Sequence, residues 1–407
     1  MATCRLLNKI CMNSPLSTPA KTASSARRFW NDPKFRAILY QIIVVALVGL
    51  GVWYLVSNTL HNLSVRNIAT GFGFLGREAG FAIGESVISY KPDDTYSRAL
   101  TVGLLNTLRA AAIGIVLATI LGTIIGIARL SKNWLVAKLA SVYVEVMRNV
   151  PLLLQLFFWY AIIAENLPGP RQALNPMTGV FLSNRGLKFP TLDGDGLTWL
   201  AGGFLLAVTL VLILANWSRR RQERTGQLFP VWRVSIALLV LLPLAFWGGS
   251  GAELRLDMPV LKGFNFRGGL TLSPEFAALL LGLVIYTAAF IAEVVRSGIQ
   301  AVSKGQWEAA ESLGFKRNWV LRLIVLPQAL RVIIPPMTSQ YLNLTKNSSL
   351  AVAIGYPDIV SVVNTTLNQT GQAIEGILII MAAYLTVSLS ISLFMNWYNA
   401  RIALVER

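Results

Sequence analysis

The chain has 407 residues, of which 54% are hydrophobic and only 14% are charged. Soluble domains carry roughly a quarter of charged residues, so this composition excludes an ordinary soluble domain and indicates a protein that crosses a membrane several times. The formal net charge of +17 would fit a nucleic-acid binder, but it also fits a membrane protein whose loops on one side collect Lys and Arg.

Eight apolar runs of about 20 residues, the length at which a helix crosses the hydrocarbon core, predict an all-α fold of membrane-spanning helices. These helices form a polytopic bundle whose spans, in chain order, are 37–56, 100–128, 141–163, 197–215, 234–249, 274–294, 332–350 and 374–397. The third and seventh runs contain prolines and polar residues, so their boundaries are the least defined.

Basic residues place the loops on one side or the other of the membrane. Residues 1–36 contain many Lys and Arg against a single acid, Asp32, so the positive-inside rule predicts a cytoplasmic amino terminus. Alternation of the spans puts three further basic loops on that side, around Arg129, in the run Arg219–Arg221 and in the loop 297–327. Both termini are then cytoplasmic. The positive charge is therefore a topology signal, and we expect no binding of nucleic acid.

The first 36 residues lack the apolar core of a cleavable signal peptide, so the first span is expected to be an uncleaved anchor. Both cysteines, Cys4 and Cys11, fall in this tail, and the single histidine is His61, so neither a disulfide nor a metal site is expected. The chain contains no G-x-x-x-x-G-K-[ST] phosphate-binding loop. We therefore expect this chain to bind no cofactor and to leave any hydrolysis of ATP to another chain.

Residues 308–327 carry the most specific pattern. They read EAAESLGFKRNWVLRLIVLP and match E-A-A, three residues, Gly, nine residues, Ile-x-Leu-Pro at every fixed position. This pattern resembles the cytoplasmic coupling segment of the membrane subunits of ATP-binding-cassette (ABC) importers, which a separate ATPase moves. The resemblance implies a role in ATPase coupling for residues in and beside the pattern, which are Trp307, Glu308, Ala309, Ala310, Gly314, Leu326 and Pro327.

The residues of this segment predict a helix-turn-helix hairpin. Ser303 is suited to cap a helix over 305–313, and Gly314 can end that helix in the left-handed conformation. A second helix follows from Lys316, and Pro327 marks the point where the backbone leaves that helix or bends.

Helical spacing puts Trp307, Ala310 and Gly314 on one face of this hairpin, where the small residues would allow another protein to approach closely. On spacing alone, the alternative is an amphipathic hairpin that only stabilises the bundle. The full match to the importer pattern favours the coupling role.

Four further segments resemble the polar amino-acid branch of these importers. They are VEVMRNVPLLLQLFF from Val144, AEVVRSGIQAVSKGQWEAA from Ala292, LPQALRVIIPP from Leu326 and LTKNSSLAVAIG from Leu344. The resemblance covers 100–165 and 274–398, the latter including the coupling loop 297–327. It implies the five-helix core of a type I ABC importer.

Three spans lie outside this core. Together with FWNDPKFRAILYQ from Phe29 and LVSNTLHNL from Leu55, they resemble the longer first-position permeases of general L-amino-acid importers in Gram-negative bacteria. The predicted division of the chain is a basic cytoplasmic tail 1–36, an extra anchor helix 37–56, a periplasmic loop 57–99, core residues 100–165, an insertion with two spans 166–273, core residues 274–398 and a cytoplasmic tail 399–407.

The resemblance implies a subunit of the bacterial inner membrane that moves L-amino acids from periplasm to cytoplasm by alternating access. It implies, besides membrane lipid, a dimer of ABC ATPases that binds ATP and magnesium, a second homologous permease and a periplasmic amino-acid-binding protein. The alternatives are an ABC permease for another small polar solute and an autonomous secondary carrier. The sequence brings together no nucleophile, base or metal set that indicates an enzyme.

Polar residues inside the predicted spans are the candidates for the substrate path, because polar groups in hydrocarbon are costly unless they face a partner or water. They are Gln155, Gln340, Asn343, Lys346 and Asn347. Lys346 could instead reach the membrane surface or another subunit. Pro151, Pro335 and Pro336 could unwind helices beside this path.

Two pairs of charged residues stand at i and i+3, where they can meet on one helix face. They are Glu145 with Arg148 and Glu293 with Arg296, and we expect both to be structural pairs near the cytoplasmic boundary. A G-x-x-x-G step at Gly122 and Gly126 predicts close packing of the second span against another helix.

Overall fold

The computed structural model describes residues 33–65, 70–227 and 229–402. Seven helices in this part of the chain are long and apolar enough to cross a membrane, and a further pair of helices bent by 105° makes eight if it is counted as one broken span. The predicted bundle of about eight membrane helices is therefore confirmed. The predicted tail at 399–407 lies largely outside the described residues, as does most of the tail at 1–36, with Cys4 and Cys11.

The first helix, α2 (Pro33–Val65), belongs to a unit of its own that ends at Thr70. It is longer than the predicted span 37–56, because polar residues at both ends continue the helix beyond the apolar run. None of its residues with a described side chain is buried. Apolar residues surround this helix on all sides, as expected of a helix that faces lipid.

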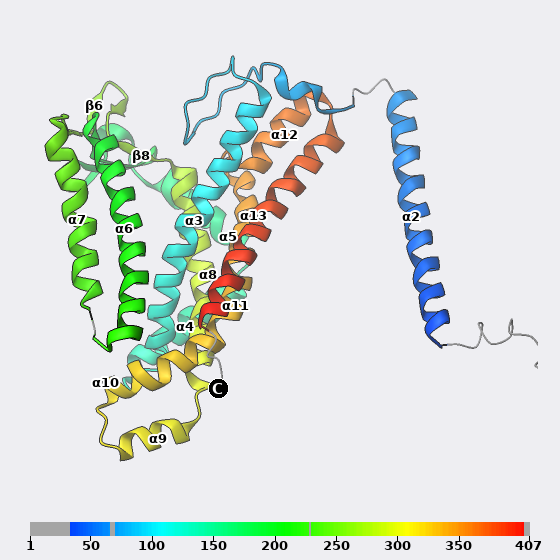
Figure 1. Cartoon of the computed structure of the whole chain (residues 1–407). Coiled ribbons are helices and arrows are strands. Elements are labelled where there is room, and N and C mark those ends of the chain that lie inside the picture. The colour runs from blue at the N-terminus through cyan, green and yellow to red at the C-terminus, as the bar shows by residue number, and fades with distance from the viewer. Residues whose placement is uncertain (1–32, 66–69, 228, 403–407) are drawn as a thin grey trace, which may run out of the picture. The chain divides into compact units, whose positions relative to one another are not determined.

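The second unit begins at Gly71 and contains the other helices (Figure 1). In chain order these are η1 (Phe72–Gly76), α3 (Tyr96–Ala128), α4 (Trp134–Asn149), α5 (Leu152–Ala161), η2 (Ile162–Asn166), η3 (Pro170–Gln172), α6 (Gly196–Thr225), α7 (Val231–Ser250), α8 (Pro274–Gln300), α9 (Lys304–Ser312), α10 (Arg317–Val320), η4 (Leu321–Val325), α11 (Leu326–Asn347), η5 (Ser348–Ile354), α12 (Ile359–Thr370) and α13 (Ala373–Ile402).

Helices α3 and α8 pack along each other more extensively than any other pair in this unit. A Cβ atom at Gly122 would lie 2.6 Å from Cγ2 of Ile291 and 2.8 Å from the carbonyl oxygen of Ala288, so only glycine fits there without a shift. Gly126 meets α8 in the same way one turn later. The close packing predicted from the G-x-x-x-G step is confirmed.

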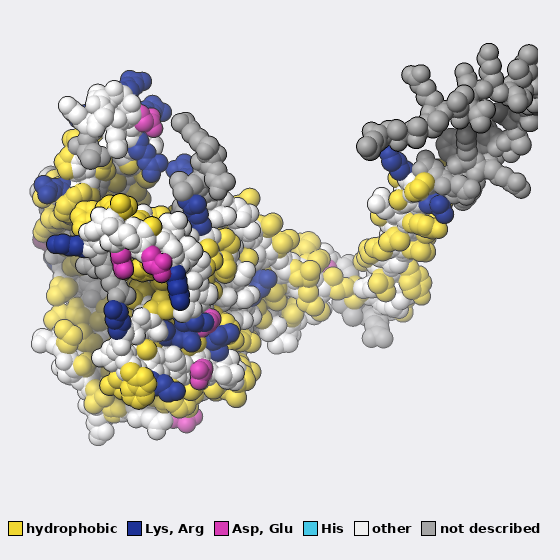
Figure 2. Space-filling model, turned by 90° about the horizontal axis from the view of Figure 1, so that it is seen from below, with side chains coloured by type: hydrophobic (Ala, Val, Ile, Leu, Met, Phe, Trp, Pro, Cys, Tyr) yellow, Lys and Arg dark blue, Asp and Glu magenta, His cyan; other side chains and the backbone are white. Residues whose placement is uncertain are grey.

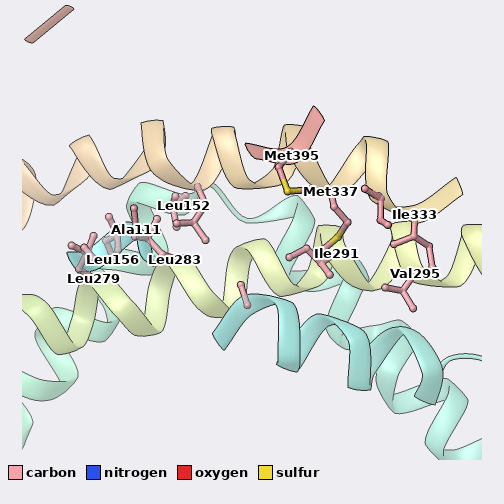
Figure 3. Packing of buried hydrophobic residues seen from close by; sticks show 14 of the residues in the cluster. Ala111, Leu152, Leu156, Leu279, Leu283, Ile291, Val295, Ile333, Met337 and Met395 are labelled. Atoms are coloured by element: carbon pink, nitrogen blue, oxygen red, sulfur yellow. The ribbon is translucent and has the colours of Figure 1, made fainter. Parts of the chain in front are cut away.

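Around this pair, side chains from α5, α11 and α13 complete the apolar core. Leu156 of α5 packs near Leu283 of α8, while Met337 of α11 and Met395 of α13 lie further along the bundle near Ile291 (Figure 3). The core is thus formed by five helices, with α8 at its centre. The outer faces of the other helices are left for lipid or partner chains.

One of the predicted spans is a broken helix. The third predicted span, 141–163, consists of α4 and α5, which meet at an angle of 105° where Pro151 begins α5. The seventh, 332–350, is helical throughout, since α11 continues directly into the 3-10 helix η5; residues 355–358, which separate η5 from α12, lie beyond it. Pro335 and Pro336 lie inside α11 without interrupting it, so the prediction that they unwind this helix is wrong. The break comes instead after Ile354.

The insertion contains α6 and α7 as a helical hairpin and short antiparallel strands that the sequence did not predict. The strands are β1 (Leu174–Met177), β2 (Val180–Ser183), β3 (Gly186–Phe189), β4 (Thr191–Asp193), β5 (Arg255–Asp257), β6 (Val260–Lys262), β7 (Asn265–Arg267) and β8 (Leu270–Leu272). They form sheets of order β1-β2-β3-β8, β4-β5 and β6-β7. The described chain is mostly helical, as predicted, but strands of three or four residues are too short to show a period in the sequence.

Successive loops of this unit lie at opposite ends of the bundle (Figure 1). The end that carries α9 and α10 is called the α9 end below, and the end that carries the strands is called the strand end. The turn between α6 and α7 also lies at the α9 end. Seen from there, Lys and Arg side chains are spread across the face and acidic side chains are fewer (Figure 2). This arrangement agrees with the alternation of loops inferred from charge.

Candidate functional site

The segment with the importer pattern forms a helical hairpin at the α9 end (Figure 1). Helix α9 agrees within one residue with the predicted helix. Gly314 follows it with a φ of +77°, and the amide of Phe315 donates to the carbonyl oxygen of Ala310 at 3.2 Å, which closes the helix end. Ser303 occupies the predicted cap position, but its side chain makes no capping hydrogen bond.

The face of α9 that carries Trp307 and Ala310 turns toward its own membrane helices. Ala310 is only 2% exposed, and Trp307 packs against the apolar core. The prediction that this face is free for another protein is therefore wrong for Trp307 and Ala310, which pack on the side of α10 and η4, whereas Gly314, the third residue of the predicted face, is exposed. The opposite face, with Glu308 and Ala309, is exposed, and Leu313 beside it is 77% exposed.

Beyond the turn, the chain returns to the membrane through a continuous helical path of α10, the π-helical η4 and α11. Pro327 lies in the first turn of α11, where a missing N–H is tolerated, and Leu326 before it is exposed. Nε2 of Gln328 donates to the carbonyl oxygen of Ile324 at 3.0 Å, within the π-helical turn. Pro327 thus lies where the π-helical η4 gives way to α11, and the chain stays helical there.

One carboxylate at the α9 end of the bundle faces three arginines. Glu293 forms the predicted ion pair with Arg296 and a second one with Arg129 at the end of α3. Arg148 of α4 approaches the same carboxylate at 4.0 Å. The predicted pair of Arg148 with Glu145 is wrong for the described chain, in which Glu145 is exposed and has no ion pair. Glu293 therefore joins α3, α4 and α8.

Helix α11 carries four of the predicted path residues on neighbouring turns. Asn343 and Lys346 are exposed, whereas Gln340 and Asn347 are half-buried. A stripe of amide and ammonium groups on an exposed face of a membrane helix must meet a partner chain or water, because hydrocarbon penalises it. The structure brings these four residues together, and their contact with a substrate stays a prediction.

Gln155, the fifth predicted path residue, lies apart from this stripe and stabilises the bend between α4 and α5. Its Nε2 donates to the carbonyl oxygens of Met147 at 3.1 Å and Val150 at 3.0 Å, two carbonyls at the end of α4. Pro151, which has no N–H, begins the next helix. The amide group of Gln155 thus satisfies main-chain acceptors that the bend leaves open, a structural role that the sequence did not reveal.

Near the strand end, buried polar groups of α3 hold the break between η5 and α12. Nδ2 of Asn106 donates to the carbonyl oxygens of Glu85 at 2.8 Å and Pro357 at 2.9 Å. Oγ1 of Thr107 accepts from the amide of Ile359 at 3.1 Å. Because buried main-chain groups outside a helix need hydrogen-bond partners, these side chains explain how the chain breaks its helical path there.

The side chain of Glu85 connects this region to two membrane helices. Its Oε1 lies 2.7 Å from the guanidinium of Arg109 in α3, and its Oε2 accepts from Oγ of Ser273 at 2.6 Å. The guanidinium also lies over the ring of Phe276. The sequence analysis did not single out these residues, although Arg109 is the one charged residue in the predicted span 100–128. A single charged residue in an otherwise apolar span is the sequence signal that could have revealed this group of residues.

Comparisons with known proteins agree with this architecture. Residues 212–404 match the family described as "Binding-protein-dependent transport system inner membrane component". The chain is 54% identical to the protein YhdX of Escherichia coli (strain K12), over 92% of this chain and 96% of that protein.

Two further relatives also match almost end to end. The chain is 53% identical to the general L-amino acid transport system permease protein AapQ of Rhizobium johnstonii, over 95% of this chain and 97% of AapQ. It is 42% identical to the glutamate/glutamine/aspartate/asparagine transport system permease protein BztB of Rhodobacter capsulatus, over 96% of this chain and 99% of BztB. With this identity over nearly its whole length, the chain belongs to the family of membrane-spanning permease subunits of binding-protein-dependent ABC importers.

Proposed function

We propose that this permease carries L-amino acids of several side-chain types from the periplasm to the cytoplasm. The observation that carries the proposal is the 53% identity to AapQ over 95% of the chain, which includes the three spans outside the five-helix core. BztB, named for two acidic amino acids and their amides, also matches this full length. BztB has the same permease architecture and is named for amino acids whose side chains differ in charge. This supports a transport path that does not select strongly among amino-acid side chains.

The orientation that fits the charge pattern has the α9 end in the cytoplasm and the strand end in the periplasm. The run Arg219–Arg221 closes α6 at the α9 end, and Lys304 and Arg322 flank the hairpin there. Because Lys and Arg gather on the cytoplasmic side of membrane proteins, this end faces the cytoplasm of a bacterial inner membrane. With eight spans that alternate in direction, as the sequence predicts, both termini are cytoplasmic.

The cytoplasmic partner is a pair of ABC ATPases that bind ATP and magnesium, while this chain binds no cofactor. They contact the open face of α9, formed by Glu308, Ala309 and Leu313, which the membrane bundle leaves uncovered. Trp307 and Ala310 hold α9 to the bundle from the other side. Closure of the ATPases then moves α9, and the bundle moves with it because α9 is packed against it.

A second, homologous permease completes the path. The polar stripe of α11, with Asn343 and Lys346 exposed, faces this second subunit and the water-filled route between the two. A periplasmic amino-acid-binding protein delivers the substrate at the strand end. In this arrangement Gln340 and Asn347 lie at the edge of the same route.

The test is purification of the tagged permease from its native membrane with identification of what accompanies it, followed by reconstitution into liposomes. We expect an ABC ATPase, a second permease and a binding protein, and uptake of several L-amino acids that requires ATP. Uptake without any ATPase would indicate a secondary carrier and contradict the proposal. ATP-driven uptake of a different polar solute alone would contradict the amino-acid substrate but not the importer.

A further inference from the structure

A polar cavity of about 360 Å³ lies near the strand end, where Glu85 meets the membrane helices. Its walls come from four segments far apart in the sequence: residues 81–85, the start of α8, the residues after η5, and α12. Three of these contribute non-helical main chain, at Gly84, Ser273 and Pro357. The cavity is large enough for a small amino acid with several waters.

The wall of this cavity is anchored to the interior of the bundle. Asn106, which holds Glu85 and Pro357 in the wall, comes ten positions after the first residue of α3, Tyr96. At 1.5 Å per residue this is roughly 15 Å along the helix. Non-helical main chain at such depth is tolerated where it lines water or is buried in protein. The non-helical segments of the cavity wall are thus held by a side chain well inside α3.

The charged side chains among its lining residues are both acidic. Glu85 is neutralised by Arg109, whereas Glu275 has no ion pair among the described residues and receives only a long contact of 3.4 Å from the hydroxyl of Tyr160. No Lys or Arg is among the residues that line the cavity. The carboxylate of Glu275 is therefore the one formal charge of the lining without an ion pair in the described chain, and it favours a cation.

Three main-chain donors beside the cavity already have partners. The amide of Phe276 donates to Oγ of Ser273, and the amides of Ile359 and Ser361 donate to Thr107 and Asp358. By contrast, one acceptor is unpaired. Asn106 is fully buried, and its Oδ1, which lies behind the wall formed by Glu85 and Pro357, has no hydrogen-bond partner in the described chain. An unpaired amide oxygen behind the wall and the carboxylate of Glu275 in it are acceptors that match an ammonium group.

We propose that this cavity is a binding site for the ammonium group that all amino acids share, occupied as the substrate enters from the strand end, with Glu275 as the residue that contacts it. This inference rests on the proposed function and deepens it. Recognition of the common ammonium group accounts for a path that accepts different side chains, because the contact does not depend on the side chain. Ser361 and Thr365 of α12 face the site as neutral lining residues.

The test measures which reagents enter the cavity in the assembled transporter, in membrane vesicles. Cys4 and Cys11 are first replaced by Ser, and Ser361→Cys or, in a second variant, Thr365→Cys then supplies a single thiol in the lining. Thr178→Cys, on an exposed turn of the strand end, is the matched control. Each thiol is treated with a cationic trimethylammonium methanethiosulfonate and with its anionic sulfonate counterpart.

The measured quantity is the ratio of the reaction rate of the cationic reagent to that of the anionic reagent. We expect this ratio to be at least about tenfold larger at Ser361→Cys than at Thr178→Cys, because the carboxylate of Glu275 attracts the cation. Adding Glu275→Gln should bring this ratio close to that of the control. L-Alanine methyl ester, which has the ammonium group without the carboxylate, should slow the reaction, whereas propionate should not.

Three results would overturn the proposal: equal rates for the two reagents, no reaction of either lining thiol, or protection by Na⁺ as effective as by the ester. The last would assign the cavity to an inorganic cation. ATP-dependent uptake by the unmodified transporter is measured in parallel and tests the proposed function separately. If that uptake is present, Glu275→Gln should lower it by a similar factor for amino acids of different side chains, and unchanged uptake would also overturn the proposal.

Discussion

The guanidinium of Arg109 lies 2.7 Å from the carboxylate of Glu85, although 24 positions separate the two residues in the chain. The pair ties an extended segment before α3 to the middle of that helix. Ser273 joins the same carboxylate at 2.6 Å, so the start of α8 is held as well. Both charged side chains are mostly buried, at 23% and 14% exposed, which makes the loss of either partner costly.

We expect Arg109→Gln to lower the free energy of unfolding by about 1–3 kcal/mol, because Glu85 keeps a poorly solvated charge without its partner. Thermal unfolding of the purified permease in detergent, followed by tryptophan fluorescence, measures this loss. Adding Glu85→Gln to Arg109→Gln should restore part of the stability, since the unpaired charge is then removed. A double variant less stable than Arg109→Gln would contradict an electrostatic origin.

Gly314→Val should abolish ATP-dependent uptake while the permease remains inserted and abundant. A β-branched residue is strained at a φ of +77°, so the turn after α9 must change its path and the face with Glu308 moves. Gly305→Ala, in the same helix at a position without positive φ or neighbours within 4 Å, is the control. Normal uptake by Gly314→Val would argue against a coupling role for this hairpin.

Glu293→Gln should destabilise the α9 end of the bundle by about 1–3 kcal/mol, because Arg129 and Arg296 lose the carboxylate they share. Glu145→Gln is the matched control on α4 and should change little, since Glu145 has no ion pair in the described chain. Melting temperatures of the two variants test this expected difference in stability. Equal effects would mean that the cluster is not a structural element.

The spans and the coupling hairpin could be predicted from the sequence because their signals are local. An apolar run of about 20 residues defines a membrane helix wherever it occurs, and a left-handed glycine ends a helix by its own geometry. For these reasons the position of α9 and the conformation of Gly314 agree with the predictions.

The partners of individual side chains could not be predicted in the same way, because they depend on how distant helices pack. Spacing put Trp307 and Ala310 on one face of α9 but could not tell that the bundle covers this face. Spacing likewise paired Arg148 with Glu145, whereas packing of α4 on α8 brings Arg148 to Glu293. The cavity at Glu85 is an extreme case, since 188 positions separate Glu85 from Ser273.

Lys188→Met should stabilise the strand-end insertion at pH 7 by roughly 1 kcal/mol, because it removes a poorly solvated charge. Lys188 on β3 is 8% exposed, and its Nζ donates to the carbonyl oxygen of Phe266 at 3.3 Å. Burial lowers the pKa of Lys188 below its usual 10.5. The unfolded chain then binds the proton more strongly than the folded chain, so this group's contribution to stability rises as the pH rises toward 10.5.

The gain from Lys188→Met should therefore shrink between neutral pH and pH 10, which melting curves at several pH values would show. Lys262→Met, at an exposed position of β6, is the control and should show no such trend. A gain for Lys188→Met that is constant with pH would mean that the charge of Lys188 is not the cause.

Gly122→Ala should destabilise the contact of α3 with α8, although alanine favours a helix by about 1 kcal/mol over glycine. The added methyl would lie 2.6 Å from Ile291 and 2.8 Å from the carbonyl oxygen of Ala288, and such overpacking costs about 1–3 kcal/mol. Gly202→Ala on α6 has nothing within 4 Å and should show the helix preference alone. We expect the melting temperature to fall for Gly122→Ala and to stay or rise for Gly202→Ala. A rise for both would mean that α3 and α8 are not held as closely as described.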